Sequence, residues 1–235
     1  MKKFSYKEYI TALNKISNAI TSDLYIEDVL KLIVTLTANV MRAKICSLWL
    51  IDEKSKELKI RATQAMSKDY LKERTIKLGE GIVGLVAKEK KPIVICDVLK
   101  DKKYKEKMLA RKEGLVSMLS APMMIKKNVY GVINCYTVAP YKFTKSDIDL
   151  LSAVANQAAV AIENTRLMVK TRVIQEELAA RKKVERAKGI LMKEQGISEE
   201  EAYTLIRKSS MDRRVSMKEI AQAIVLAYEV RKIKK

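Results

Sequence analysis

The sequence predicts an α+β protein in which an antiparallel sheet with helices is followed by a long helix and a three-helix unit. Two pairs of apolar or alternating segments predict the sheet, because a short polar stretch joins the members of each pair, as is typical of β-hairpins. A third observation predicts the long helix: no Pro or Gly interrupts the chain between Lys145 and Gly189.

The first two elements are expected to be helices. Apolar side chains recur every three or four residues over 4–20, which predicts a helix within a separate N-terminal segment, 1–22. The same spacing returns over 26–41. The residues of this second helix that are expected to face the core are Leu30, Ile33, Val34 and Thr37.

After the second helix the apolar spacing becomes that of strands. One hairpin is expected across the polar turn 53–56 and another across Lys126–Asn128. Between them, 99–113 carries seven Lys or Arg residues and is expected to be a solvated loop or an exposed helix. The expected strands are 44–52, 57–65, 92–98, 116–125 and 129–138. The stretch 76–78 leads into a turn at Gly79–Gly81, and a short helix is expected at 82–91.

The long helix is expected to begin with a capping box formed by Thr144 and Asp147, and to end at Gly189 or Gly196. Its apolar seam shifts once by four positions, and so long a seam with a stutter predicts a coiled coil between two copies of the chain. The alternative is a helix that packs on its own sheet and then on its own tail. The seam consists of Leu151, Ala155, Ala158, Ile162, Thr165, Val169, Val173, Glu177, Ala180, Val184, Ala187 and Leu191.

Two further capping boxes mark the helices that complete the C-terminal unit. Ser198 with Glu201 begins one helix, and Ser216 with Glu219 begins the next. The residues expected to be buried are Ala202, Leu205, Ile206 and Ser209 in the first, and Met217, Ile220, Ala221, Ile224, Val225 and Tyr228 in the second.

Composition excludes several classes of function. The chain has 47 Lys and Arg against 28 Asp and Glu, a net charge of +19, which favours a polyanionic partner. Because the chain has no His, catalytic triads with His and sites with His-ligated metal or haem are excluded. Three separated cysteines, Cys46, Cys96 and Cys135, form no disulfide framework and no Cys-x-x-Cys site, and we expect them to be buried thiols.

We expect a cytoplasmic protein that holds no cofactor and no metal. Free thiols are typical of a reducing compartment. No uncharged apolar run approaches the ~18 residues that a membrane span needs, and Glu8 and Asn14 interrupt any signal-peptide core.

The segment 23–167 resembles a GAF domain. The resemblance rests on the order of elements, on LGEGIVGLVAKEKKPIVICDV at 78–98 and on FTKSDIDLLSAVANQAAVAIENTRL at 143–167. It implies a six-stranded antiparallel sheet with helices on one face and a small-molecule pocket on the other. Strand alternation suggests that Leu48, Cys96, Met118 and Asn134 line this pocket, the alternative being that they are ordinary core residues.

The segment 180–235 resembles the ANTAR domain of transcription antitermination regulators, and 168–179 would be a coiled-coil linker. The matching residues are ARKKVERAKGILMKEQGISEEEAYTLIRKSSMDRRVSMKEIAQAI at 180–224. The resemblance implies binding to hairpin loops in messenger RNA leaders. Many members place a phosphorylated receiver domain before this unit; because a GAF-like domain stands there instead, phosphorylation is not the expected input. Ser210 stands where the family usually has Ala.

Helical spacing places Lys182, Arg186, Gly189 and Lys193 on one face. Gly costs about 1 kcal/mol relative to Ala inside a helix, so Gly189 suggests close approach of another backbone, either RNA or the following helix. Each cation taken singly could instead be a solvated charge. The residues expected to bind RNA are Arg181, Lys182, Arg186, Lys188, Gly189, Lys193, Arg207, Lys208, Arg213 and Arg214.

A homodimer would present this surface twice, which raises the affinity for an RNA with two hairpins. Two other functions are open to a basic protein with this predicted fold. A DNA-binding regulator would need base-reading groups on its last helix, where only Lys218 and Gln222 are available. A GAF-like methionine sulfoxide reductase would need exposed, neighbouring cysteines. We therefore expect a regulator and not an enzyme.

Overall fold

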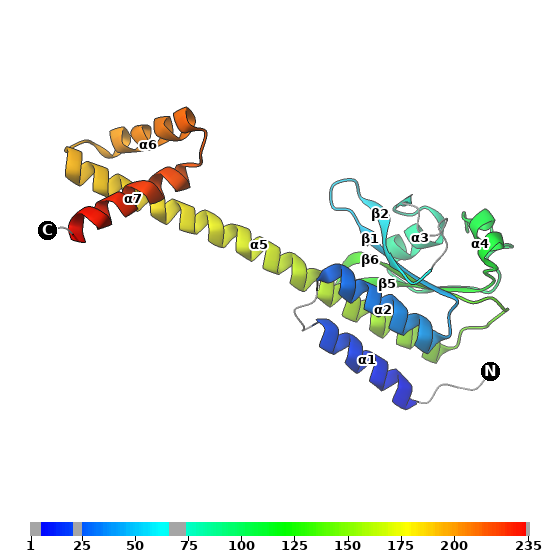
Figure 1. The fold of residues 1–235 in the computed structure, drawn as a ribbon. Helices are drawn as coiled ribbons and strands as arrows, with labels where there is room; N and C mark the ends of the chain where they lie inside the picture. The colour runs from blue at the N-terminus through cyan, green and yellow to red at the C-terminus, as the bar shows by residue number, and fades with distance from the viewer. Residues whose placement is uncertain (1–5, 21–24, 66–73, 234–235) are drawn as a thin grey trace. The chain divides into compact units, whose positions relative to one another are not determined.

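The computed structural model describes residues 6–20, 25–65 and 74–233, and the chain separates into two compact units, Met1–Thr165 and Arg166–Lys235. The N-terminal unit contains α1 (Tyr6–Ile20), α2 (Ile26–Met41), β1 (Ile45–Ile51), β2 (Glu57–Thr63), β3 (Thr75–Lys77), α3 (Gly81–Glu89), β4 (Ile93–Ile95), α4 (Lys107–Glu113), β5 (Met118–Ile125) and β6 (Asn128–Tyr136). Helix α5 (Lys145–Gln195) runs from this unit into the C-terminal one, which ends with α6 (Glu199–Arg213) and α7 (Met217–Ile233) (Figure 1).

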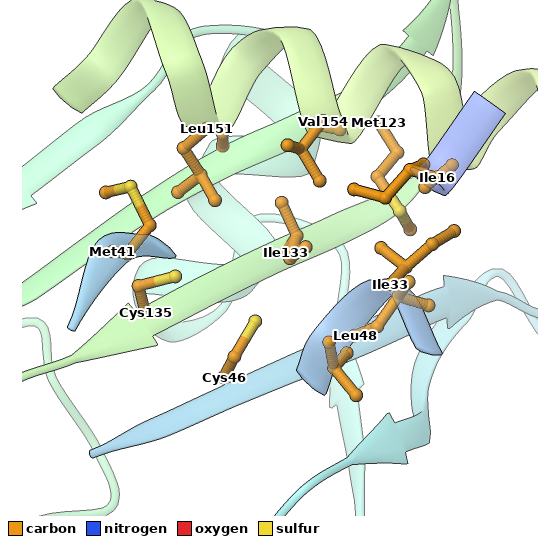
Figure 2. Packing of buried hydrophobic residues seen from close by; sticks show 14 of the residues in the cluster. Ile16, Ile33, Met41, Cys46, Leu48, Met123, Ile133, Cys135, Leu151 and Val154 are labelled. Carbon is orange, nitrogen blue, oxygen red and sulfur yellow. The ribbon is translucent and has the colours of Figure 1, made fainter. Parts of the chain in front are cut away.

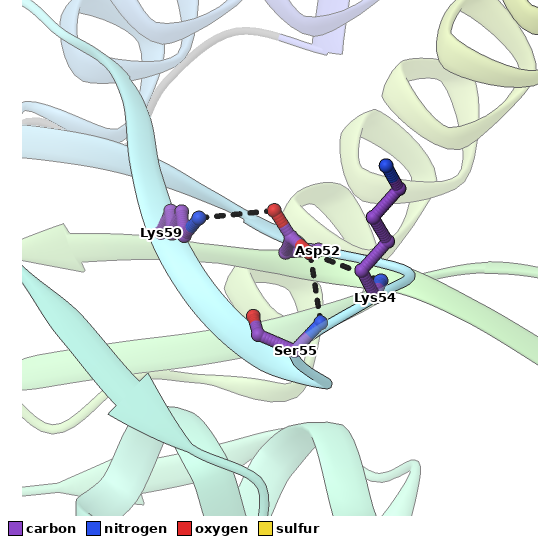
Figure 3. A network of polar contacts seen from close by, with 4 residues as sticks. All are labelled: Asp52, Lys54, Ser55 and Lys59. Atoms are coloured by element: carbon purple, nitrogen blue, oxygen red, sulfur yellow. Dashed lines mark hydrogen bonds and ion pairs between the residues drawn. The ribbon is translucent and has the colours of Figure 1, made fainter.

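The six strands form one antiparallel sheet in the order β3-β2-β1-β6-β5-β4. The α+β prediction and both expected hairpins are confirmed. In the first hairpin the Asp52 carboxylate accepts hydrogen bonds from the N–H groups of Lys54 and Ser55 and pairs with Lys59 at 3.0 Å (Figure 3). Because these bonds favour its charged form, the pKa of Asp52 lies well below its usual value. The polar turn is therefore closed by a single ionised side chain.

Each face of the sheet carries its own apolar core. Cys46 and Leu48 of β1 point to the core covered by α2 and α5, where Ile16 of α1 is also buried (Figure 2). Ile45 and Trp49 of the same strand point to the opposite core, which α3 covers. This alternation is the period of two that the sequence shows at β1.

The strand expected at 92–98 is shorter than predicted, because β4 ends at Ile95. The side chain of Asp97 accepts hydrogen bonds from the N–H groups of Leu99 and Lys100, at 3.0 and 3.3 Å, which favours a turn over a continued strand. Cys96 lies after the strand and is exposed, so the expectation that all three cysteines are buried is wrong at this position.

Helix α5 is 51 residues long and passes through Gly189 without a break. The expected capping box is present at its start, since Asp147 N–H donates to Thr144 Oγ1 at 3.3 Å and Thr144 N–H donates to Asp147 Oδ2 at 2.7 Å. Residues early in its seam, such as Leu151 and Ala158, are buried in the core of the N-terminal unit. The large apolar residues of its middle part are exposed: Leu167, Met168, Val169, Val173, Ile174 and Leu178.

The C-terminal unit has a small core of its own. Both expected capping boxes form, at Ser198 with Glu201 and at Ser216 with Glu219. The fully buried side chains include Ala202 and Ile206, as predicted, but Leu205 is 40% exposed and corrects the predicted set. Leu205 lines an open groove formed by residues of α5, α6 and α7. The buried residues of this core are Ala187, Leu191, Ala202, Ile206 and Ala221.

Candidate nucleic-acid interface

The expected basic row lies on the outer face of α5 in the C-terminal unit. Lys182, Arg186, Gly189 and Lys193 are all exposed. The opposite face carries Ala187 and Leu191 into the small core. The helical spacing read from the sequence therefore corresponds to a continuous solvent-exposed row.

Gly189 lies in the middle of this row with open space in front of it. A Cβ atom added there would meet no atom of the described residues within 4 Å. Close packing against α6, one of the two readings of this glycine, is therefore absent from the described part of the chain. The helix carries the cost of a glycine, about 1 kcal/mol relative to Ala, without an internal contact that requires it.

Lys188 was expected to flank the row, but it is turned away from it. Its side chain is buried, and its Nζ atom lies 2.7 Å from Glu199 and 2.9 Å from Glu185. The bond to Glu199, and then that to Glu185, raises the pKa of Lys188. Adjacent residues point about 100° apart on a helix, so Lys188 faces α6 while Gly189 faces solvent. This corrects its place in the predicted RNA-binding set.

Arg186 is exposed but has an acidic partner within the unit. Its Nη2 atom lies 2.6 Å from Glu229 of α7. Lys183, beside it, donates to Gln222 of α7 at 2.8 Å. Exposed ion pairs contribute only about 0–1 kcal/mol, so a phosphate could replace Glu229 as the partner of Arg186 at little cost.

The remaining predicted cations are exposed and make no ion pair within the described residues; they are Arg181, Lys182, Lys193, Arg207, Lys208, Arg213 and Arg214. Arg213 is the last residue of α6, and Arg214 follows as its C-cap with a φ of 56°. The Ser210 hydroxyl donates to the carbonyl of Val215 at 2.5 Å, across the end of this helix. The serine found in place of the family's usual Ala thus bonds to the backbone beside the two arginines.

The four residues expected to line the small-molecule pocket do not lie together. Leu48 belongs to the core under α2 and α5, whereas Met118 belongs to the core on the opposite face. Asn134 is buried and accepts a hydrogen bond from Ser120 at 2.6 Å, and Cys96 is exposed. The predicted pocket is therefore wrong as a set.

A different cavity, of about 250 Å³, lies on the α3 face of the N-terminal unit. No local pattern in the sequence points to its charged residues, because their pairing joins segments far apart in the chain: Arg74 donates to Glu106, 32 positions later. The lining residues are Arg74, Thr75, Ile76, Glu80, Gly81, Ile82, Val83, Tyr104, Lys105, Glu106 and Tyr136.

The GAF domain family model matches residues 26–162, which is more than half of the chain. The chain belongs to the GAF domain family. A second family model, that of the ANTAR domain, matches residues 172–225, so the GAF domain is followed by an ANTAR domain as the sequence resemblance indicated.

Curated relatives resemble one or the other domain. The transcriptional regulatory protein PdtaR of Mycobacterium tuberculosis is 34% identical over 90 residues, 38% of this chain and 42% of PdtaR. The nitrate regulatory protein of Klebsiella oxytoca is 38% identical over 79 residues, 34% of this chain and 19% of that protein. The chain thus spans less than half the length of these relatives.

Solved structures resemble the GAF domain in fold. The GAF domain of a phosphoenolpyruvate-protein phosphotransferase from Coxiella burnetii superposes with a TM-score of 0.64 at 22% identity, covering 70% of this chain and 98% of that one. Free methionine-R-sulfoxide reductase from Neisseria meningitidis gives a TM-score of 0.60 at 18% identity, covering 72% and 97%. At these identities the likeness concerns the fold alone.

The cysteines of this GAF domain do not form an exposed group. Cys46 and Cys135 are buried directly opposite each other on β1 and β6. Burial, and then the neighbouring Cys135, raises the pKa of the Cys46 thiol, which disfavours the thiolate that redox chemistry needs. The exposed Cys96 lies beyond the end of β4. Among the described residues no group of three or more His, Cys, Asp or Glu could hold a metal ion, and no helix is long and apolar enough to cross a membrane.

Proposed function

We propose that this protein is an RNA-binding transcription antitermination regulator. Its ANTAR domain binds hairpin loops in nascent messenger RNA, and its GAF domain controls that binding in response to a small molecule or a partner. The observation that carries the proposal is the exposed row of Lys182, Gly189 and Lys193, with open space at the glycine. A sugar-phosphate backbone can approach the helix closely there, between two cations that release its counterions.

Hairpin loops suit this surface better than duplex nucleic acid. The major groove of A-form RNA is too narrow for side chains, whereas loop bases are unstacked and accessible. The exposed Arg213 and Arg214 can bond to phosphates or stack on such bases. A DNA-reading function is less well supported, because Gln222 on α7 already accepts a bond from Lys183 and Lys218 is half-buried.

We infer that the working form is a homodimer. Six large apolar side chains from Leu167 to Leu178 are 49–72% exposed. They belong to the part of α5 that follows the last residue packed on the core of the N-terminal unit and precedes the first residue packed on the core of the C-terminal unit. Val169 and Val173 belong to the seam whose spacing is typical of a coiled coil. A second copy of the same helix would cover these residues and present two RNA-binding surfaces to two hairpins.

The protein acts as a cytoplasmic regulator without catalysis of its own. The burial of Cys46 and Cys135 supports this proposal, because it leaves Cys96 without an accessible cysteine beside it, and a reductase of the GAF fold would need exposed, neighbouring cysteines. The polyanionic partner suggested by the net charge of +19 is then RNA.

Binding of the full chain to three labelled nucleic acids tests the proposal: an RNA with two hairpins, the same RNA with scrambled loop sequences, and duplex DNA, each at two salt concentrations. The two-hairpin RNA is expected to bind most tightly, with an affinity that falls as salt rises. The double variant Lys182→Glu/Lys193→Glu is expected to lose this binding and to flatten its salt dependence. The charge-matched control is Lys54→Glu/Lys91→Glu, which changes two exposed lysines of the GAF domain. Equal binding to intact and scrambled loops would refute specific loop recognition.

A further inference from the structure

The cavity on the α3 face has two walls from different parts of the GAF domain. One wall consists of β3 and the start of α3, and includes Arg74 and Glu80. The other is the segment before α4, and includes Lys105 and Glu106. Its volume of about 250 Å³ is below the ~300–1,000 Å³ typical of pockets for drug-sized ligands. The cavity therefore fits a small metabolite and not a tetrapyrrole.

Two ion pairs join the walls, and the cation comes from a different wall in each pair. Arg74 Nη1 lies 2.5 Å from Glu106 Oε1, with both side chains about four-fifths buried at 18% and 23% exposure. Glu80 of the first wall pairs with Lys105 of the second. Each wall thus contributes one cation and one anion, and the four charges sum to zero.

The rest of the cavity is apolar with two phenol groups. Tyr104 is buried and lies edge-on to Tyr136, with ring centroids 6.4 Å apart. Burial raises the pKa of Tyr104, so its hydroxyl stays neutral and can donate or accept hydrogen bonds. Ile76 and Ile82 supply apolar surface. These groups can accommodate a short side chain of a ligand.

The N-terminus of α3 adds a preference for a carboxylate. Gly81, Ile82 and Val83 form its first turn and all line the cavity. The side chain of the residue before them, Glu80, makes no capping hydrogen bond to the helix. Backbone N–H groups at a helix start favour a negative group, here next to Arg74.

We infer that this cavity binds a free α-amino acid as a zwitterion, its carboxylate next to Arg74 and the start of α3 and its ammonium next to Glu106. The paired charges select for a ligand that carries both signs, because the ammonium group of an amino acid can pair with Glu106, whereas a phosphate ester has no positive group for that carboxylate. The inference rests on the proposed sensing role of the GAF domain and names its ligand class; it does not depend on RNA binding.

Isothermal titration calorimetry of the full chain, without RNA, tests the inference with each of the twenty free amino acids. At least one is expected to bind, and its α-amide and its N-acetyl derivative are each expected to bind at least tenfold more weakly. Inorganic phosphate and adenosine monophosphate serve as anionic probes. Absence of binding by all twenty at 10 mM, tight binding of the amide, or tighter binding of the phosphate probes would overturn the inference.

Two variants, each of which removes one charge from the cavity, test whether the amino acid binds there. Arg74→Gln and Glu106→Gln are each expected to weaken the bound amino acid at least tenfold, whereas Lys59→Gln, which removes the ion pair with Asp52 outside the cavity, is expected to leave the affinity unchanged. Thermal unfolding of each variant establishes that it is folded. Unchanged affinity in both folded cavity variants would place the ligand elsewhere. Because RNA is absent, this result is independent of the result for the proposed function.

Discussion

The Nζ atom of Lys188 lies 2.7 Å from Oε1 of Glu199, across the junction between α5 and the first turn of α6. Glu185, one turn earlier on α5, contacts the same ammonium at 2.9 Å. A lysine placed beside the RNA-binding row by its sequence position thus holds two helices of the ANTAR domain together.

Lys188→Glu is expected to destabilise the ANTAR domain. The change would bring three carboxylates together at the junction of α5 and α6, where their like charges repel. Lys188→Met, which keeps the length of the side chain without the charge, is expected to destabilise less. Thermal unfolding followed by circular dichroism measures both; an unchanged midpoint in Lys188→Glu would show that the junction contributes nothing.

The same ion pair predicts a dependence of stability on pH. Lys188 lowers the pKa of Glu199 below its ordinary value of 4.5. The stabilisation by this ion pair is therefore present above pH 4.5 and is lost as the pH falls through the lowered pKa. Glu199 and Glu185 raise the pKa of Lys188 above 10.5, so the contribution is lost again as the pH rises through the raised pKa.

The difference in unfolding midpoint between the wild type and Lys188→Met measures that contribution. We expect it to be constant between about pH 6 and pH 9 and to shrink toward either extreme. A difference that persists unchanged at about pH 2, where carboxylates are protonated, would show that the ion pairs of Lys188 with Glu185 and Glu199 are not its source.

Gly189→Ala is expected to change stability and RNA binding in opposite directions. The added methyl group meets open space and gains helix propensity, so the domain should become more stable by about 1 kcal/mol. The same methyl group would hold an RNA backbone away from the helix, and the affinity for the two-hairpin RNA should fall. Asn164→Ala, at an exposed position of α5 in the N-terminal unit, is the control. Unweakened RNA binding by Gly189→Ala would refute close approach at this site.

The exposed apolar part of α5 is expected to control oligomeric state. Val173→Glu/Ile174→Glu places charges in the proposed coiled coil and should give a monomer by sedimentation analysis. Its affinity for an RNA with two hairpins should fall by roughly 10²–10⁴-fold, while that for a single hairpin stays the same. Lys170→Glu, in the same exposed stretch, is the control. A wild-type protein that sediments as a monomer both free and RNA-bound would refute the dimer.

Local signals in the sequence predicted the elements of the fold well. Side chains that cap or close a turn act within a few residues, so the capping boxes at Thr144, Ser198 and Ser216 could be located correctly. The turn that follows β4 is also local, since Asp97 accepts hydrogen bonds from the N–H groups of Leu99 and Lys100, but the apolar run at 92–98 predicts a strand that includes this aspartate.

The cavity could not be predicted in the same way. Alternation tells which residues of one strand share a face, but it does not relate the faces of two strands before their register is known. Leu48 pairs with Ile133 whereas Met118 pairs with Tyr136, and the two side chains point to opposite cores. The ion pair of Arg74 with Glu106 joins residues 32 positions apart, and no local pattern contains it.

The wall formed by β3 and α3 is held by a close backbone approach at Gly84, where a Cβ atom would lie 2.3 Å from the carbonyl oxygen of Lys77. That wall can scarcely shift, so adjustment of the cavity to a ligand depends on moving Lys105 and Glu106 on the other side. A metabolite that pairs with Arg74 and Glu106 then binds only after the ion pair between them has parted. The observed association rate would level off at high metabolite concentration, at the frequency with which that ion pair opens.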